Sequence, residues 1–169
     1  MFWTRFGTLP GDGDGVMAVW QARGLPDGIS LRAGGAEGAG GRTAVFAGVD
    51  VRSPIASHSE RRPLDIAWTA GAGLGAGDYG LVSVPVGIAA GRSWSSGAVW
   101  LDPYVVLGFA MDLALGRDAP DDDFRVSPSV DLGLDLALDR RRTLVLRVAT
   151  ALGDRHAVAV GISAGAGAR

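Results

Sequence analysis

Hydrophobic and polar residues alternate with a period of two along much of this chain. The clearest run extends from Val99 to Leu115, where every odd position is apolar or proline and the even positions, apart from Val106, are small, polar or aromatic. A period of two is typical of a β-strand with one apolar face, because successive side chains point to opposite sides of the strand. This run therefore predicts a long strand with two unlike faces.

The next run, Phe124 to Asp139, is the main point at which a helix competes with a strand. Asp131 and Asp135 belong to an aspartate repeat every four residues, as on one side of a helix, whereas the leucines recur every two residues. Residues two apart lie about 200° apart around a helix but on one side of a strand. The leucines therefore favour a strand here as well.

Weaker alternation of the same kind continues through the rest of the chain. The further candidate strands are Val16–Arg23, Ile29–Ala33, Val45–Arg52, Leu64–Leu74, Leu81–Ile88, Thr143–Val148 and Ala157–Ile162. Turn-forming residues separate them, and longer polar loops are expected at Gly34–Arg42, Ser53–Pro63, Arg92–Ala98 and Gly116–Asp123. Strands joined in this way, without a helix, predict an all-β antiparallel up-and-down meander.

A sheet with one apolar face must cover that face with protein or with lipid. The opposite face of these strands holds mostly Gly, Ala, Ser and Thr with scattered Asp and Arg, which suits a narrow barrel interior better than a water-facing surface. The two longest runs also exceed the roughly 9–11 residues that cross a bilayer as a tilted strand. The pattern therefore favours a small transmembrane β-barrel with its apolar face outward.

The predicted barrel assigns two sets of residues, one to its interior and one to its lipid-facing surface. The first is an internal ionic network, because charges enclosed in a narrow lumen need partners: Arg32, Asp50, Arg52, Asp65, Asp102, Asp112, Arg125, Asp131, Asp135 and Arg147. The second is a lipid-facing set: Val84, Val86, Ile88, Val105, Leu107, Phe109, Val130, Leu132, Leu134, Val158, Val160 and Ile162.

Composition narrows the class further. The 169 residues suit one domain, and the 16 basic residues are all Arg against 18 acidic residues, so no basic footprint for nucleic acid exists. The absence of Cys excludes disulfides and thiolate metal sites. We expect an N-terminal segment at 1–13 that is irregular or an extra strand, one barrel domain at 14–165 and a short tail at 166–169, with no metal and no cofactor.

Three stretches together resemble a known family. They are Val82-Ser83-Val84-Pro85-Val86-Gly87-Ile88, Trp100-Leu101-Asp102-Pro103-Tyr104-Val105 and Asp131-Leu132-Gly133-Leu134-Asp135-Leu136. Across roughly residues 42–165 the chain is similar to the small outer-membrane β-barrel proteins of Gram-negative bacteria, the OmpA-like and porin-like group.

The resemblance implies a location in the outer membrane, with the lipid bilayer and the outer-membrane assembly machinery as partners. Bacterial barrels have an even number of strands, so we expect eight, with either the short first run or one misread segment dropping out, or ten if Phe2–Leu9 adds one. The first ten residues lack a secretory pattern, so a signal segment is expected to have been removed or to lie upstream.

Four groups of residues raise other chemistry. Ser57-His58-Ser59-Glu60 contains the residue types of a hydrolase, with His156 as a second histidine. Asp118 and Asp121-Asp122-Asp123 offer carboxylates to a cation without the spacing of a calcium loop. The glycines of 71–75 and 34–41 precede no helix, so the phosphate-cradle interpretation fails. Arg140-Arg141-Arg142 is expected to be an ordinary charged hairpin tip, with contact to anionic lipid headgroups as the alternative.

Three functions follow, in order of preference. The first is a non-enzymatic outer-membrane barrel with a structural, surface-contact or narrow-pore role, in which Trp100 and Tyr104 fill or gate the interior. The second is a soluble lipocalin-like or sandwich protein that binds an apolar ligand on the same apolar face. The third is an outer-membrane lipid hydrolase that uses His58 with Ser57 or Ser59.

Overall fold

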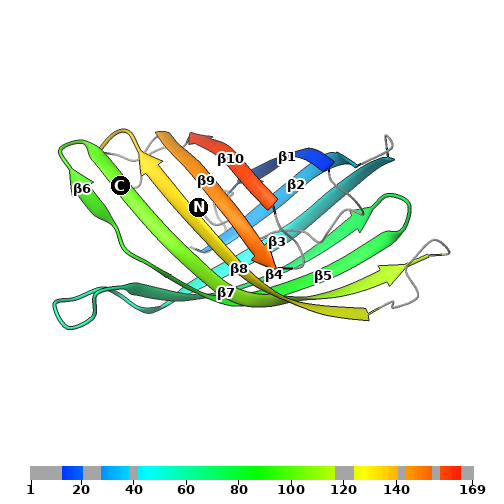
Figure 1. Ribbon diagram of the computed structural model, residues 1–169, viewed down its shortest axis with the longest axis horizontal. Coiled ribbons are helices and arrows are strands. Elements are labelled where there is room, and N and C mark those ends of the chain that lie inside the picture. Colours follow the sequence, from blue (N-terminus) through cyan, green and yellow to red (C-terminus); the bar gives the residue numbers. More distant parts are fainter. Residues whose placement is uncertain are drawn as a thin grey trace. The chain divides into compact units, whose positions relative to one another are not determined.

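The computed structural model describes residues 13–20, 28–38, 42–116, 124–140, 144–153 and 157–164. Their regular structure is entirely β (Figure 1). The strands are β1 (Gly13–Trp20), β2 (Ile29–Gly38), β3 (Arg42–Ala56), β4 (Asp65–Ala76), β5 (Gly80–Gly91), β6 (Trp94–Ser96), β7 (Val99–Leu115), β8 (Phe124–Ala137), β9 (Leu144–Gly153) and β10 (Ala157–Ala164). Across these ranges no helix has the length and apolarity to cross a membrane.

The strands form an antiparallel meander. Their order in the sheet is β1-β2-β3-β4-β5-β7-β8-β9-β10, so strands that follow one another in the chain are also neighbours in the sheet. β6 stands off this path and pairs with β7 alone, from Trp94 opposite Leu101 to Ser96 opposite Val99. The all-β antiparallel meander predicted from the alternating pattern is therefore confirmed.

The strand number corrects the sequence prediction of eight. Within the described residues, nine strands follow the path and β6 is additional. The short first run, one of the two options for the segment that drops out, forms β1 and pairs with β2 over its whole length, from Gly13 opposite Gly38 to Trp20 opposite Leu31. The alternative strand Phe2–Leu9 lies outside the described residues.

Strand boundaries match the alternation closely where it is strong. β7 spans the predicted Val99–Leu115, and β8 begins at the predicted Phe124. Two expected loops are shorter than predicted, because β2 continues to Gly38 and β3 continues to Ala56. The loop expected at Arg92–Ala98 contains the short strand β6, whose three residues are too few to show a period.

The chain divides into two compact units. Unit 1 comprises residues 1–53, 68–87 and 109–127, and unit 2 comprises residues 54–67, 88–108 and 128–169. Figure 1 shows β1 beside β2 in unit 1 and β9 beside β10 in unit 2, as their pairing requires.

Burial is inverted relative to a water-soluble domain. The buried apolar side chains of the described residues are alanines and a single valine, Val106, whereas Leu, Ile, Phe, Trp and Met are all at least partly exposed. The buried polar residues include charged ones such as Arg32 and Arg147. We call the side of each strand that carries buried small and polar residues the polar face, and the opposite side the apolar face.

A glycine explains why β2 extends past its predicted end. A Cβ atom placed on Gly34 would lie 2.6 Å from Cζ of Phe46, the residue opposite it on β3, and would also overlap a backbone oxygen of β1. The Phe46 ring therefore covers Gly34, an arrangement in which an aromatic side chain compensates for a glycine in a strand. The same residue that resembled a loop signal in the sequence is required by the packing of the strand.

Two adjacent glycines of β2 offer a matched test of this packing. Gly34→Ala should lower the free energy of unfolding by about 1–3 kcal/mol, because the added methyl group overpacks the site beneath Phe46. Gly35→Ala should be neutral or stabilise by about 0.5–1 kcal/mol, because its Cβ would meet only ordinary contacts at 3.4 Å or more. Urea unfolding, in the aqueous or detergent medium in which the wild type folds, measures both. Equal effects of the two substitutions would contradict the assigned role of Gly34.

Candidate functional site

The polar face concentrates the ionisable side chains that the fold removes from solvent. The buried polar residues of the described ranges are Arg32, Asp50, Thr69, Ser83, Asp112, Ser127 and Arg147. Fully buried charges are rare in proteins unless they are paired, because an isolated charge loses its hydration. This face is therefore the candidate site, and its geometry depends on how these charges are paired.

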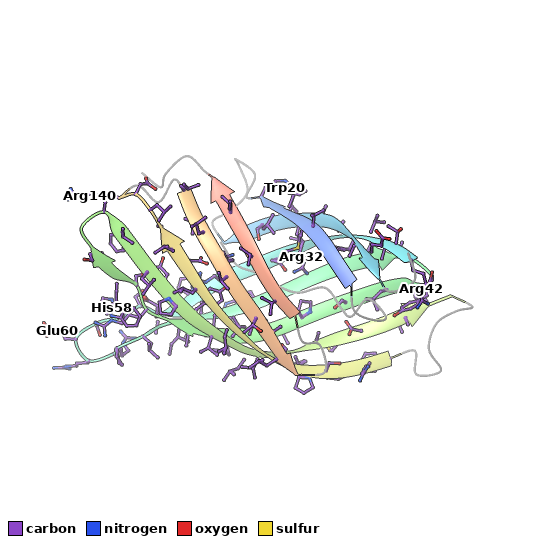
Figure 2. The ribbon with its side chains drawn as sticks, turned by 45° about the horizontal axis from the view of Figure 1, so that its top comes forward. Trp20, Arg32, Arg42, His58, Glu60 and Arg140 are labelled. Atoms are coloured by element: carbon purple, nitrogen blue, oxygen red, sulfur yellow. The ribbon has the colours of Figure 1, made fainter. Side chains whose placement is uncertain are left out.

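In unit 1 the pair is Arg32 of β2 with Asp50 of β3. Nη1 of Arg32 lies 2.9 Å from Oδ1 of Asp50, and the two residues are only 1% and 5% exposed. Arg32 is opposite Gly48 in the register, so the ion pair crosses diagonally from one strand to the next. Gly71 makes room for the carboxylate, since a Cβ there would lie 2.5 Å from Oδ1 of Asp50. Figure 2 labels Arg32 on its strand.

In unit 2 the pair is Arg147 of β9 with Asp135 of β8, which are directly opposite each other in the register. Nε of Arg147 donates to Oδ1 of Asp135 at 2.5 Å, and Nη2 donates to Oδ2 of the same carboxylate. This two-point geometry is the strong form of an arginine–carboxylate pair, because both donors of the fork are used. It joins two neighbouring strands through their polar faces.

Tyr104 of β7 completes the cluster in unit 2. A Cβ on Gly133 would overlap the Tyr104 ring, so the ring lies against a strand position that only glycine leaves open. The guanidinium carbon of Arg147 lies 5.7 Å from the centre of the ring, within the range of a cation–π contact. Asp131 and Asp135 are the other charged neighbours of the Tyr104 hydroxyl.

Two buried hydroxyls accompany the charges in unit 1. Ser83 of β5 and Ser127 of β8 are 0% and 1% exposed, and neither Oγ has a hydrogen-bond partner among the described residues. Buried hydroxyl groups are normally hydrogen-bonded to protein or to ordered water. Ser83 and Ser127 are therefore positions on the polar face where an ordered water molecule would complete the hydrogen bonding.

The structure distributes the other residues of the predicted ionic network differently. Asp112 is buried in unit 1, and Asp102 and Arg52 are partly buried. Arg125 is exposed near the start of β8. Asp65 lies at the start of β4, where Oδ1 accepts the backbone N–H of His58 at 2.7 Å. Asp65 therefore holds a connection between strands in place.

The predicted lipid-facing residues lie on the apolar face. Those that are exposed are Ile88, Leu107, Phe109, Val130, Leu132, Leu134, Val158, Val160 and Ile162, and those that are partly exposed are Val84, Val86 and Val105. Contact with lipid itself stays a prediction.

The hydrolase candidates do not form a catalytic arrangement in the described part of the chain. Ser57, His58, Ser59 and Glu60 are all exposed, and Ser59 pairs through its backbone with Arg62 in a tight turn. Figure 2 shows His58 and Glu60 in the connection that follows β3. His156 lies outside the described residues, as do Asp118, Asp121 to Asp123, Arg141 and Arg142.

Metal binding finds no support among the described residues, where no group of three or more His, Cys, Asp or Glu side chains is arranged to hold an ion. The residues of the polar face form paired charges, an aromatic ring and hydroxyls. Such a set can orient water and resist deformation, and it contains no activated nucleophile.

Sequence reasoning missed several residues that shape this face. Ser83 and Ser127 sit at alternating positions like any strand serine, so their burial was not visible in the pattern. The glycines on the charged side of the strands were expected to fit a crowded interior, but the side chains that lie against Gly71 and Gly133, Asp50 and Tyr104, were missed. Arg92, whose guanidinium lies 5.8 Å from the centre of the Trp94 ring, fell in a predicted loop.

Comparison with models of protein families, with curated proteins and with solved structures finds no match to this chain. Its function is therefore argued from its own residues.

The ion pair of unit 2 can be tested against a surface pair in the same protein. Arg147→Leu should lower the free energy of unfolding by about 3–5 kcal/mol, because it leaves the Asp135 carboxylate buried without its partner. The double variant Arg147→Leu with Asp135→Leu should regain most of that loss, since neither charge then remains.

The control is the pair Arg42–Asp78, whose side chains are 57% and 39% exposed at 3.1 Å. Arg42→Leu should change the free energy of unfolding by no more than about 1 kcal/mol. Denaturant unfolding of the wild type and the three variants measures these changes in the free energy of unfolding. A double variant no more stable than Arg147→Leu alone would show that the buried pair is not the source of the effect.

Proposed function

We propose that this chain is a small, non-enzymatic outer-membrane β-barrel protein with a structural or surface-contact role. The sheet is proposed to close so that the polar face lines the interior and the apolar face contacts lipid. The lipid bilayer and the outer-membrane assembly machinery are the partners that this proposal implies.

One observation carries the proposal: the burial pattern is inside out. Large apolar side chains are exposed on strands throughout the sheet, and they include Leu107 at 56%, whereas Arg32, Asp50 and Arg147 are buried. In water an exposed apolar surface of this extent would promote association, and contiguous apolar patches on soluble monomers seldom exceed a few hundred Å². A lipid environment removes that cost, because acyl chains solvate apolar side chains.

Strand length and aromatic positions agree with a membrane. β3, β7 and β8 contain 15, 17 and 14 residues, more than the roughly 9–11 needed to cross the hydrocarbon core. Trp20, Trp68 and Trp94 are exposed; Trp20 ends β1, Trp94 begins β6 and Trp68 is the fourth residue of β4. Tryptophan is favoured at membrane interfaces, where its ring meets the acyl chains and its N–H meets polar groups.

Closure imposes a condition on strand number. Nine strands that alternate in direction leave β1 and β10 running the same way at the two ends of the order. An all-antiparallel bacterial barrel has an even number of strands, so closure in that form needs one more strand between them, for which Phe2–Leu9 is the candidate in the sequence. The edges agree with a missing neighbour, since Val16, Val158, Val160 and Ile162 are between 72% and 79% exposed.

The interior supports a closed or narrow structure in place of an open pore. In barrels of eight to ten strands, side chains largely fill the lumen, and here the polar face carries the Arg32–Asp50 pair and the Tyr104 cluster. Water beside Ser83 and Ser127 would supply their hydroxyls with partners. This favours a stabilising or surface-contact role over free diffusion of solutes.

Purification with and without detergent tests the proposal directly. We expect the protein to need detergent or lipid to fold and to migrate differently on a denaturing gel before and after heating. A monodisperse, cooperatively folded protein in plain buffer would overturn the membrane proposal and favour the soluble ligand-binding alternative. Esterase activity lost in His58→Ala would favour the hydrolase.

A series of substitutions along β7 would measure how deep each residue lies in the lipid bilayer. Leu107 is the central residue of the strand, and Val99 and Leu115 end it on the same face. Leu107→Arg should make folding into lipid vesicles less favourable by about 2–4 kcal/mol, and Val99→Arg and Leu115→Arg by about 0–1 kcal/mol each. The penalty for a charge falls toward the membrane interface. Equal, small effects at all three positions would indicate a water-facing surface.

A further inference from the structure

The connections at one end of the strands of unit 2 carry an unusual set of charges. β3 ends at Ala56, β5 ends at Gly91 and β8 ends at Ala137, and antiparallel order places these three ends at the same edge of the sheet. We call the connections that follow them, residues 57–64, 92–93 and 138–140, the long-loop end. Figure 2 shows His58, Glu60 and Arg140 at this end.

Four arginines lie at the long-loop end without a carboxylate partner. Arg61, Arg62 and Arg140 are exposed, Arg92 is partly exposed, and none of the four forms an ion pair with any described residue. A guanidinium offers five N–H donors in a planar fork that matches carboxylate and phosphate oxygens. The surface therefore presents donors that the rest of the described chain leaves unused.

Nearby carboxylates are occupied by backbone groups. Oδ1 of Asp65 accepts the N–H of His58 at 2.7 Å, and Oδ1 of Asp139 accepts the N–H of Leu144 at 3.1 Å. These bonds hold the two connections in place and keep those aspartates directed at the backbone. Glu60 is the remaining carboxylate of the described loop 57–64, and it is exposed near the tip.

The opposite strand end, in unit 1, is arranged differently. Arg42 begins β3, and its Nη1 lies 3.1 Å from Oδ2 of Asp78 in the short turn between β4 and β5. The cation at that end is therefore neutralised within the protein. Within the described residues, Arg42 therefore has a carboxylate partner, whereas the four arginines of the long-loop end form no ion pair.

Apolar residues border the arginines on the strand side. Trp94 is 48% exposed and lies opposite Leu101, which is exposed on the same apolar face, and Leu138 and Leu144 are exposed beside the β8–β9 connection. The guanidinium of Arg92 lies over the Trp94 ring. A surface with a cationic rim next to an aromatic and aliphatic band matches a lipid, which joins a phosphate to acyl chains.

We propose that the long-loop end of unit 2 binds the headgroup phosphates of anionic lipids through Arg61, Arg62, Arg92 and Arg140. The proposal rests on the proposed membrane function and adds to it a lipid class and a set of residues. The apolar band contacts the acyl chains of the same lipids, and Trp94 lies at the boundary between the two.

The test uses the full chain folded into vesicles of phosphatidylcholine mixed with phosphatidylglycerol. Bromine atoms placed on the acyl chains of one lipid or the other quench tryptophan fluorescence, so the two quenching curves give the ratio of binding constants for the anionic and zwitterionic lipids. The wild type should prefer phosphatidylglycerol several-fold at low salt, with each arginine accounting for up to about fivefold. The preference should vanish near 1 M salt, where the screening length is about 3 Å.

The quadruple variant Arg61→Gln, Arg62→Gln, Arg92→Gln and Arg140→Gln should bind the two lipids equally well while inserting into phosphatidylcholine like the wild type. The matched control is Arg42→Gln, which removes one positive charge at the opposite strand end and should leave the ratio unchanged. A quadruple variant with the wild-type ratio, or an Arg42→Gln effect as large as that of Arg92→Gln alone, would overturn the proposal.

Two further arms separate the possible failures. Replacing chloride with inorganic phosphate at equal ionic strength should not change the ratio of the two binding constants. If millimolar phosphate abolished the preference for phosphatidylglycerol, the site would be assigned to free phosphate and the lipid assignment would be overturned. Quenching by brominated phosphatidylcholine without any preference would overturn only this inference. An absence of quenching by either lipid would overturn the proposed membrane function itself.

Discussion

The structure depends on the pairing of buried guanidinium groups with carboxylates on adjacent strands. Arg147 and Asp135 are opposite each other in the register, and Arg32 reaches Asp50 across β2 and β3. A shift of either register by one residue would place the two partners on opposite faces of the sheet. Two uncompensated charges would then be left, so these ion pairs specify strand register and the identity of the buried face together.

The ion pairs and the aromatic rings of the polar face also require space, which glycine provides. Asp50 lies against Gly71, Tyr104 against Gly133 and Phe46 against Gly34. In each case the position opposite a bulky or charged side chain cannot accept a Cβ. The high glycine content, 27 of 169 residues, thus has a structural role beyond the turns. Small residues on the polar face allow long polar side chains to lie along the sheet.

The sequence predicted the class of fold because alternation is a local property. β7 and β8 were found from their period, since each has more than a dozen residues over which two faces can be distinguished. Gly34 and Gly35 hid the end of β2, because what makes them strand residues is a ring on another strand. The choice between Asp131 and Asp135 as the partner of Arg147 likewise depends on register, which alternation does not contain.

The exposure of the apolar face follows from the burial of the polar face. Had Leu107, Leu132 and Leu134 formed the core of a soluble protein, Arg32 and Asp50 would face water, where an ion pair contributes little and needs no glycine to accommodate it. Instead Asp50 is 5% exposed and fits against Gly71. The cost of removing these charges from water is offset only if they remain paired on the buried polar face, which leaves the leucines on the exposed apolar face. An exposed surface of leucine and valine calls for an equally apolar cover. In the proposed function lipid supplies that cover along the 17 residues of β7.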